Sequence, residues 1–494
     1  MVELMNFNGF LKFTDVKWEW LRRIIRPLLI RIPWLRRKVQ LFLWRMRARP
    51  FYRQRIQGIS KLLDDCNARR RKNGGPKNII LIVVDCLRKS NLSLYGHYRE
   101  TTPFLESLAG RAAVFDNTLT ACPWTYPSVA SILTGLYPHN HGGVLTTDPC
   151  RFGQEAPNKV SRNVLALPEV LTGLGFDCHI FSSVTVAAWA GMDWFKNIYI
   201  YRQRAQQQFK ELNRCLEKNK KKDNFIYFHL GDLHVPLDVP DDYRESFGEI
   251  ADIPRLNYWQ FEKDADREAP DFKRYKENRC KLYDCALRSV DAQIAGLFGY
   301  LEKLRLLDSS LVILTADHGE EFWEHTETER KLFYDPRGFS GISHGHNLFQ
   351  EIINVPLLCT GPGIASGRYT HNTSLVDIVP TILDVCGIDH RLKLDGRNLF
   401  DNSNERALVS EAVAYGYEKK AVVRKNWKLI HSEGDGVSLL FDLYRDPKEK
   451  HDLAKINPEK IQELKSHLPK AEVKGETLEI DRAMKKQLQD LGYM

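Results

Sequence analysis

Three side chains that can bind a metal ion follow two apolar runs of the sequence. The run NIILIVVD, residues 78–85, ends on Asp85, and the run SLVILTADHGE, residues 310–320, carries Asp317 and His318 near its end. Both runs are rich in β-branched residues, as strands buried on both faces are. Ligands of open α/β sheets collect at the carboxyl ends of the strands. Together these residues predict a metal site, whereas either aspartate alone would be read as a cap or turn residue.

A hydroxyl side chain placed to meet an anion lies between the two runs. Thr125 opens the segment TYPSVASILTG, residues 125–135, and Pro127 suits the first turn of a helix. Backbone N–H groups and the dipole at a helix N-terminus favour an anion, so the Thr125 hydroxyl can meet a phosphate or sulfate group there. Taken by itself, a threonine at such a position is more often a plain helix cap.

The elements that must position these residues alternate between strands and helices. This alternation predicts an α/β domain over residues 76–400, with a mostly parallel sheet and helices on both faces. Residues 401–494 predict a smaller α+β subdomain, with strand-like AVVRKNWKLIHS and SLLFDLYRD and a helical end from Pro458. A chain of 494 residues with 43% hydrophobic and 27% charged residues is not disordered as a whole.

Residues 1–75 form a basic arm whose composition differs from that of the rest. They carry 19 Lys and Arg against 5 Asp and Glu, whereas the whole chain has a net charge of +9. Within residues 18–55, arginines alternate with Trp, Leu and Ile, which is typical of a segment lying on an anionic membrane surface. A helical arm packed on the body is an equal alternative. No nucleic-acid-binding fold accompanies the charge, so nucleic acid is not expected as a partner.

The sequence also bears on location. No apolar run approaches the roughly 20 residues of a bilayer-spanning helix, and the first residues lack the features of a secretory signal. The ten cysteines form no CxxC pair, which favours buried thiols in a reducing compartment over a disulfide framework or zinc ribbon. We therefore expect a cytoplasmic protein, peripheral on the inner membrane face if the arm binds lipid.

Six motifs occur in an order that resembles a known family. They are NIILIVVDCLRKSNLSLYGHYRETTPFLESLA, TYPSVASILTGLYPHNHG, LTADHGE, HNLFQEIINVPLL, SLVDIVPTIL and FDLYRDPKEKHDLA. Their order over residues 76–455 resembles that of the sulfatase family of the alkaline phosphatase superfamily. The resemblance implies an alkaline-phosphatase-like fold with a small antiparallel C-terminal sheet. It also implies a metal-dependent ester hydrolase with a covalent nucleophile.

The resemblance assigns roles to single residues. It implies that Asp85, Asp317 and His318 bind the metal and that Thr125 occupies the nucleophile position. Sulfatases hold there a cysteine or serine that is converted to formylglycine within the pattern CxPSR. This chain has Thr125 instead, and Val129 in place of the arginine. We therefore expect a threonine variant of the family, in which Thr125 is both nucleophile and metal ligand.

Two departures from the family pattern bear on which metal ion and which class of ester substrate we expect. Cys86 stands where many sulfatases have a second aspartate, so the implied ligand set is Asp85, Thr125, Asp317 and His318, which suits Mn²⁺ or Zn²⁺ better than Ca²⁺. A formylglycine hydrate expels sulfate by collapsing to the aldehyde, but a threonine ester must be attacked at sulfur or phosphorus. Attack at a metal-held phosphoryl group is a common mechanism, so we expect phosphate or phosphonate esters to be favoured over sulfate esters.

Further candidate residues follow from the same resemblance. His234 in FHLGDLHVPL occupies the place of a substrate-binding or leaving-group histidine, and Asp232 is close enough in sequence to orient it. In SHGHNLFQE, His344 matches the family pattern HGxxLYxE better than His346, and either would bind the transferred group or a second metal. Asn117 is a weaker candidate for contact with that group. A structural role is an equal alternative for each histidine.

Three functions fit these observations. The first is a metal-dependent hydrolase of sulfate, phosphate or phosphonate esters that acts through Thr125 on a small-molecule, glycan or lipid substrate. The second is a transferase that passes a phospho group to a glycan or lipid at the membrane surface. The third is a membrane-attached binding protein without catalysis, which the complete set of metal-binding residues disfavours.

Overall fold

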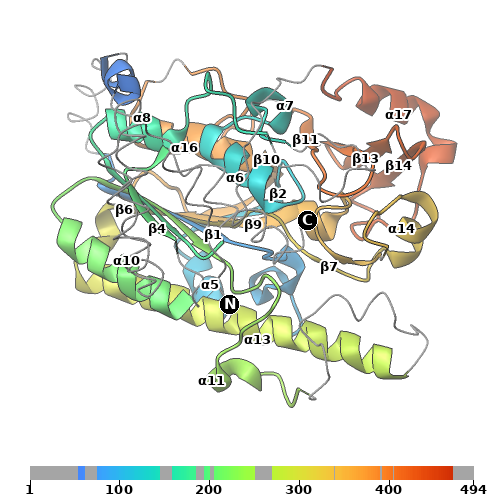
Figure 1. The fold of residues 1–494 in the computed structure, drawn as a ribbon, viewed down its shortest axis with the longest axis horizontal. Helices are drawn as coiled ribbons and strands as arrows, with labels where there is room; N and C mark the ends of the chain where they lie inside the picture. Colours follow the sequence, from blue (N-terminus) through green and yellow to red (C-terminus); the bar gives the residue numbers. More distant parts are fainter. Residues whose placement is uncertain are drawn as a thin grey trace, which may run out of the picture.

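The computed structural model describes most of the chain between residues 54 and 470. The described residues are 54–61, 75–144, 158–184, 194–200, 205–250, 270–338, 340–389, 392–403 and 405–470. They form a large central sheet, helices on both faces of that sheet, and a second, smaller sheet (Figure 1).

The central sheet has eight strands in the order β10-β2-β9-β6-β1-β5-β3-β4. Five neighbouring pairs run parallel, and only β9 runs antiparallel, between β2 and β6. The prediction of a mostly parallel sheet is therefore confirmed. The strands are β1 (Asn78–Val84), β2 (Ala113–Leu119), β3 (Asp177–Ser182), β4 (Asn197–Ile200), β5 (Asn224–Leu230), β6 (Ser310–Ala316), β9 (Asn354–Thr360) and β10 (Gly367–Ser374).

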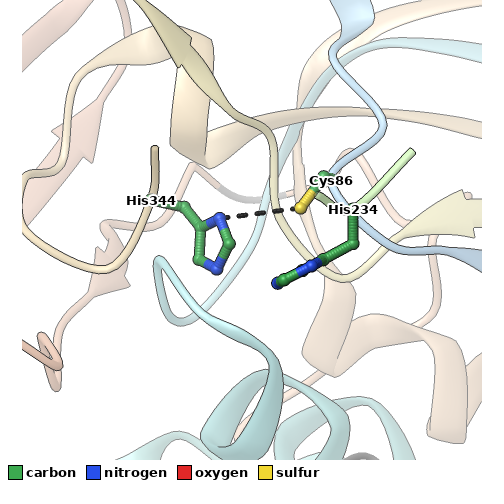
Figure 2. Close-up of side chains that lie close together, drawn as sticks. All are labelled: Cys86, His234 and His344. Atoms are coloured by element: carbon green, nitrogen blue, oxygen red, sulfur yellow. Dashed lines mark hydrogen bonds between the residues drawn. The ribbon is translucent and has the colours of Figure 1, made fainter. Parts of the chain in front are cut away.

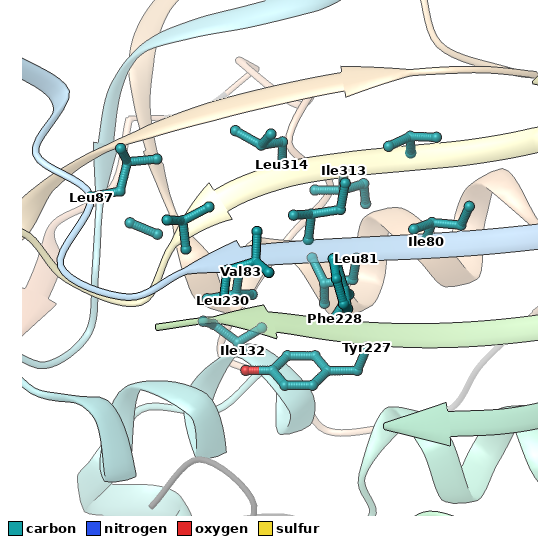
Figure 3. Packing of buried hydrophobic residues seen from close by; sticks show 14 of the residues in the cluster. Ile80, Leu81, Val83, Leu87, Ile132, Tyr227, Phe228, Leu230, Ile313 and Leu314 are labelled. Atoms are coloured by element: carbon teal, nitrogen blue, oxygen red, sulfur yellow. The ribbon is translucent and has the colours of Figure 1, made fainter. Parts of the chain in front are cut away.

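Strand β1 lies in the middle of the sheet between β5 and β6, and all three strands are buried along their whole length. Figure 3 shows Leu81 and Val83 of β1 beside Phe228 and Leu230 of β5 and Ile313 of β6. A parallel strand covered on both faces has no solvated side, which explains the continuous apolar run in the sequence.

Helices cover both faces of the sheet, as the sequence predicted (Figure 1). One face carries α5 (Pro103–Ala109), α10 (Ala205–Asn219) and α13 (Pro270–Lys303), and the other carries α6 (Thr125–Thr134), α8 (Leu167–Gly173) and α16 (Ile378–Val385). All ten residues of α6 are buried, so the first turn of this helix faces the interior of the protein. Shorter helices are α7 (Pro138–His141), α11 (Asp241–Arg244), α14 (Thr326–Leu332) and α15 (Gln350–Ile353).

A second sheet of antiparallel strands follows the main domain, in the order β11-β12-β13-β14. It shares a buried apolar cluster with Leu348, Phe349 and Ile352 of the main domain. The strands predicted after residue 401 and the helix predicted at Pro458 lie here. The elements are β11 (Leu408–Ser410), β12 (Lys420–Arg424), β13 (Trp427–Ser432), β14 (Val437–Asp442) and α17 (Pro458–Lys465); a separate pair, β7 (Glu321–Phe322) and β8 (Ile342–Ser343), lies in the main domain.

The described end of the basic arm packs on the main domain. Residues 54–61 are helical, Ile59 is buried in the main core, and Arg55 forms a salt bridge with Glu169 of α8. This part of the arm follows the packed-arm alternative. Most of the proposed membrane segment, residues 18–53, lies outside the described residues. Among the helices that are described, none is long and apolar enough to cross a bilayer.

Candidate active site

The ends of β1 and β6 meet the start of α6 at one edge of the central sheet. β1 and β6 run parallel and in register up to the pair Val84 and Ala316, so Asp85 and Asp317 follow at the same edge. Helix α6 begins at Thr125, as its sequence predicted. Three segments that are distant in sequence therefore bring the expected residues to one place.

His318 lies at the centre of this group. Its Nε2 is 3.2 Å from Thr125 Oγ1, 3.4 Å from Asp85 Oδ1 and 3.5 Å from Asp317 Oδ2. All four side chains are buried. His318 Nδ1 lies 2.8 Å from the Gly319 carbonyl oxygen, to which it donates, so Nε2 carries the lone pair that a metal ion needs. The four residues predicted as metal ligands are thus adjacent.

Two hydroxyl groups fix the Asp317 backbone against the start of α6. Thr120 Oγ1 and Ser128 Oγ lie 2.6 Å and 2.7 Å from the Asp317 carbonyl oxygen and 3.0 Å from each other. Ser128 belongs to the first turn of α6, one residue after Pro127. These hydrogen bonds hold the end of β6 in a fixed position relative to Thr125.

His229, near the end of β5, joins the group although the sequence analysis did not single it out. Its Nε2 lies 3.7 Å from Asp317 Oδ2, and its Nδ1 lies 3.0 Å from the Tyr227 hydroxyl. Ligand atoms of Asp85, His229 and Asp317 all lie within 4.8 Å of one another. The sequence did carry a signal for His229. It stands inside a strand that is buried on both faces, where a polar group needs a partner.

The donor atoms of this group fit a divalent metal ion. Asp85 Oδ2, His229 Nε2 and Asp317 Oδ2 are buried and have no hydrogen-bond partner among the described residues. Burial, together with the nearby Asp317, raises the pKa of Asp85 well above its usual value. Buried carboxylates with bare lone pairs are costly without a compensating cation. Carboxylate and imidazole donors together suit Zn²⁺ or Mn²⁺.

A second group of side chains adjoins the first. His344 Nδ1 lies 3.1 Å from Glu320 Oε2 and 3.6 Å from Cys86 Sγ. The His344 ring centroid is 4.3 Å from that of His318 and 5.3 Å from that of His234. Figure 2 shows Cys86, His234 and His344 converging from three separate segments. The predicted residues His234 and His344 therefore lie beside the predicted metal ligands.

Burial keeps both of these histidines neutral. Burial, together with the nearby His318, lowers the pKa of His344 to about 3. Burial also lowers the pKa of His234. The Nδ1 of His234 donates to the Val235 carbonyl oxygen at 2.6 Å, and its Nε2 is buried without a hydrogen-bond partner among the described residues.

Asp232 does not take the position expected for it. Its two carboxylate oxygens lie 3.0 Å and 3.2 Å from the backbone nitrogen of Ala205, the first residue of α10. The His234 Nδ1 instead meets Val235 O. Because helix N-termini offer unpaired N–H groups, the carboxylate caps α10 rather than orienting His234.

His346 and Asn117 also make contacts away from the Thr125 group. His346 Nε2 lies 3.1 Å from Glu321 and 3.0 Å from Glu329, and although burial opposes protonation, Glu329 raises the pKa of His346 to about 10. His346 is thus a buried cation between two carboxyl groups. Asn117 Nδ2 donates to the Thr370 carbonyl oxygen at 2.7 Å, between β2 and β10. Neither contact supports the substrate-binding role predicted from the sequence.

Arg279 on α13 is a second residue that the sequence analysis missed. Its side chain is 2% exposed, and its Nε and Nη1 have no hydrogen-bond partner among the described residues. Burial is the main cause of the lowered pKa of His234. Nearby carboxylates and a hydrogen bond oppose this shift, and the positive charge of Arg279 lowers the pKa further. A buried guanidinium with two nitrogens that no described residue binds is suited to bind an anionic group.

The greater part of the chain matches the model of a known family. A family model described as Sulfatase matches residues 77–388. The chain belongs to the sulfatase family. Members of this family are metal-dependent, which agrees with the buried ligand atoms described above. The resemblance that the six motifs indicated is confirmed at the level of the family.

Curated relatives are sulfatases. Arylsulfatase K from Xenopus laevis is 24% identical over 478 residues, covering 80% of this chain and 82% of that protein. Choline-sulfatase from Rhizobium meliloti is 30% identical over 187 residues, and that match covers 36% of this chain and 33% of the relative. The expected enzyme class, an ester hydrolase, agrees with these names.

Solved structures confirm the fold. A protein solved in complex with its substrate D-glucosamine-2-N,6-O-disulfate is 16% identical, with a TM-score of 0.61, over 85% of this chain and 98% of that chain. The phosphonate monoester hydrolase of Agrobacterium radiobacter is 18% identical, with a TM-score of 0.59, over 79% and 95%. The predicted alkaline-phosphatase-like architecture with its small C-terminal sheet is therefore confirmed.

Proposed function

We propose that this protein is a metal-dependent hydrolase of phosphate or phosphonate esters whose nucleophile is Thr125. The observation that carries the proposal is the buried Thr125 hydroxyl at the start of α6, 3.2 Å from Nε2 of His318. A hydroxyl at this place adjoins the metal-binding atoms and lies at the anion-binding end of a helix. Sulfate esters are the competing substrate class.

Four residues would hold the divalent ion, for which we expect Mn²⁺ or Zn²⁺. They are Asp85, Thr125, Asp317 and His318, with His229 as a further donor. When bound, such an ion lowers the pKa of an alcohol and neutralises charge that develops on phosphoryl oxygens. The protein contributes donor atoms that are already converged and buried, so little reorganisation accompanies the reaction.

The reaction would proceed in two displacements. In the first, the Thr125 oxygen bonds to phosphorus while the bond to the leaving oxygen breaks, and the proton of Thr125 ends on the leaving alcohol. In the second, water attacks the same phosphorus, and the released Thr125 oxygen takes back a proton. We expect the buried Nε2 of His234, which bears a lone pair, to move these protons.

Arg279 would recognise anionic oxygens of the substrate. The family arginine of CxPSR is replaced here by Val129. A buried guanidinium whose Nε and Nη1 have no hydrogen-bond partner among the described residues would replace that lost charge. A phosphate monoester carries two negative charges and a phosphonate monoester carries one, so the strength of their interaction with the guanidinium would differ.

The transferase alternative shares the first displacement and differs only in the acceptor. A glycan or lipid alcohol would then replace water in the second step. Its membrane component rests on residues 18–55, and both this contact and the cytoplasmic location stay predictions. The cysteines of the described residues are free thiols, and all but Cys280 are buried, which fits a reducing compartment.

A substrate panel tests the proposal. Purified wild type and Thr125→Ala would be given an aryl sulfate, an aryl phosphate monoester, a phosphate diester and a phosphonate monoester, each with Mn²⁺ or Zn²⁺. We expect turnover of phospho substrates by wild type, lost in Thr125→Ala. Preferential turnover of the aryl sulfate would overturn the phospho preference. Phospho turnover that appears only with a glycerolipid or glycan alcohol would support the transferase.

A further inference from the structure

A cleft lies between the main domain and the small C-terminal sheet. Its volume is about 740 Å³, which is in the range of small-molecule sites, and such sites are common at domain interfaces. The lining comes from residues 88–91 after β1, from residues between 443 and 450 after β14, and from Cys280 and Asp284 of α13. We call this space the interdomain cleft.

The interdomain cleft is separate from the candidate active site. None of the residues assigned above to metal binding or proton transfer lines it. Arg88 forms part of the boundary, because its Nη1 donates to the Glu320 carbonyl oxygen and its Nη2 pairs with Glu324. Arg88 is buried, and its guanidinium carbon lies 4.5 Å from the centroid of the Phe322 ring. Arg88 and Phe322 line the cleft, whereas the Glu320 carboxylate meets His344.

The acidic residues that line the cleft are all paired with basic residues of the same lining. The pairs are Arg88 with Glu324, Arg99 with Asp284 at 2.6 Å, and His325 with Glu351 at 2.6 Å. Although burial opposes protonation, Glu351 raises the pKa of His325 to about 9, so this pair also consists of two opposite charges. The paired carboxylates therefore leave no uncompensated negative charge to repel an anion.

Three lysines of the lining have no such carboxylate. Lys89 is half-buried, and Lys448 and Lys450 are exposed. Lys89 and Lys450 donate to the carbonyl oxygens of Asp116 and Glu324. In the part of the chain that the structure describes, none of the three lysines forms a salt bridge. The cleft therefore carries a surplus of three positive charges.

Lys89 is the most enclosed of these cations. Its Nζ lies 4.9 Å from the centroid of the Tyr95 ring, and the Arg368 guanidinium carbon lies 5.4 Å from the same centroid. The Asp116 carboxylate is bound by Arg368 Nε at 2.8 Å. Two cations thus adjoin one ring, and the carboxylate beside them is used by Arg368. An ammonium group has three N–H donors, so Lys89 keeps donors for a further acceptor.

We propose that the interdomain cleft binds the phosphate group of a phosphomonoester, held by Lys89, Lys448 and Lys450. A lysine ammonium binds phosphate as a point charge, and a phosphate group carries about two negative charges, which the surplus of positive charge balances. Tyr98 lines the cleft and is 78% exposed, so it offers ring surface to the organic part of the ester. This site does not rest on the proposed function, because no residue of the catalytic set takes part in it.

Acetylation of Lys89 in the full-length protein tests the site. Burial and the nearby Arg368 lower the pKa of Lys89 to about 8, although Asp116 opposes the shift, so a reagent for unprotonated amines should modify Lys89 at that pH. Mass spectrometry would follow acetylation of Lys89 and of the exposed Lys210 on α10 as inorganic phosphate is added. At a phosphate concentration about ten times the dissociation constant, acetylation of Lys89 should slow about tenfold, because only the free protein reacts. The rate at Lys210 should not change.

Variants show which side chains carry the effect. In Lys89→Met, the phosphate concentration that protects Lys448 should rise about 10–100-fold, the value of a hydrogen bond to a charged group. In Lys448→Met, the concentration that protects Lys89 should rise about 2–5-fold, as for an exposed charge pair. Lys210→Met is the matched control. Arg279→Met, which removes the proposed substrate contact, should keep the protection, so failure of the catalytic proposal leaves this result intact. Circular dichroism would verify that each variant folds.

A soluble ester and a lipid headgroup can both supply the phosphate group, and two further probes distinguish them. Glycerol 3-phosphate and vesicles of phosphatidic acid would be given to Thr125→Ala, so that neither ester is hydrolysed. Protection of Lys89 by glycerol 3-phosphate supports a soluble ligand, whereas protection by the vesicles alone supports a lipid. Unchanged acetylation of Lys89 with all of the probes, no acetylation of Lys89 in their absence, or equal protection of Lys210 would overturn the proposal.

Discussion

The hydroxyl oxygen of Thr125 lies 3.2 Å from Nε2 of His318, although 193 residues separate the two in the sequence. The contact joins the start of α6 to the end of β6. Asp85 and Asp317 lie within 3.5 Å of the same nitrogen. The proposed nucleophile, a helix N-terminus and the proposed metal ligands therefore lie together in one buried place, which is the arrangement that a covalent phosphoryl or sulfuryl transfer needs.

Replacement of Thr125 should separate its chemical role from its packing role. Thr125→Ala removes the hydroxyl and should lower kcat by a factor of about 10³ or more, because nucleophile deletions have effects of that order. Thr125→Ser keeps the hydroxyl and should retain measurable turnover. Steady-state kinetics on an aryl phosphate or phosphonate would compare them. Retention of kcat within tenfold in Thr125→Ala would exclude Thr125 as the nucleophile.

His229→Gln should weaken metal binding. The variant removes the buried Nε2, which has no hydrogen-bond partner among the residues that the structure describes and lies 3.7 Å from Asp317 Oδ2. We expect the dissociation constant for Mn²⁺ or Zn²⁺ at the Asp317 site to rise about 10–100-fold, as for losses of supporting metal contacts. Chelator competition would measure it. His431→Gln on β13, outside the site, serves as the matched control. Equal affinities in His229→Gln and wild type would show that His229 is not a ligand.

Arg279→Met should lower activity without lowering stability. Methionine fills much of the arginine volume and removes a buried charge whose Nε and Nη1 have no hydrogen-bond partner in the described part of the chain, so the melting temperature should stay equal or rise. The kcat/KM for a phosphate monoester should fall about 10–100-fold, the value of a hydrogen bond to a charged group. Arg288→Met on the same helix, where the side chain is 30% exposed, is the control. A fall in melting temperature with unchanged kcat/KM would assign Arg279 a purely structural role.

His325 should make the stability of the fold depend on pH. Its Nδ1 lies 2.6 Å from Glu351 Oε1, and although burial opposes protonation, this bond raises the pKa of His325 from 6.5 to about 9. The stabilisation is complete below pH 6.5 and is lost as the pH rises through about 9. It amounts to on the order of 2–3 kcal/mol.

Urea unfolding at several pH values between 6 and 10 would measure this effect. The difference in unfolding free energy between wild type and His325→Gln should shrink with rising pH. A difference that stays constant over that range would contradict the expected ion pair.

The residues that the sequence located best are those at element boundaries. Asp85 and Asp317 end apolar runs, and Thr125 begins a helix, so strand and helix ends were visible without knowing which strands pair. His229 was missed because it stands inside the run NFIYFHL, where the apolar residues indicate only a buried strand. Its role depends on β5 lying next to β1, which is a property of the sheet order.

Contacts between residues distant in the chain could not be derived in the same way. Asp232 was assigned to His234 because they are close in sequence, whereas its carboxylate caps α10. Asn117 bonds to Thr370, 253 residues away, through the pairing of β2 with β10. Motif matching favoured His344 over His346 but offered both the same roles, although they face different neighbours.

Trapping of the covalent intermediate tests the central claim most directly. Wild type loaded with Mn²⁺ or Zn²⁺ would be mixed with an aryl ester of phenylphosphonic acid, quenched in acid within milliseconds, digested and examined by mass spectrometry. We predict a phenylphosphonyl group on the peptide that contains Thr125, absent from Thr125→Ala. Turnover of this ester by wild type without any adduct on Thr125, matched by turnover in Thr125→Ala, would contradict the account.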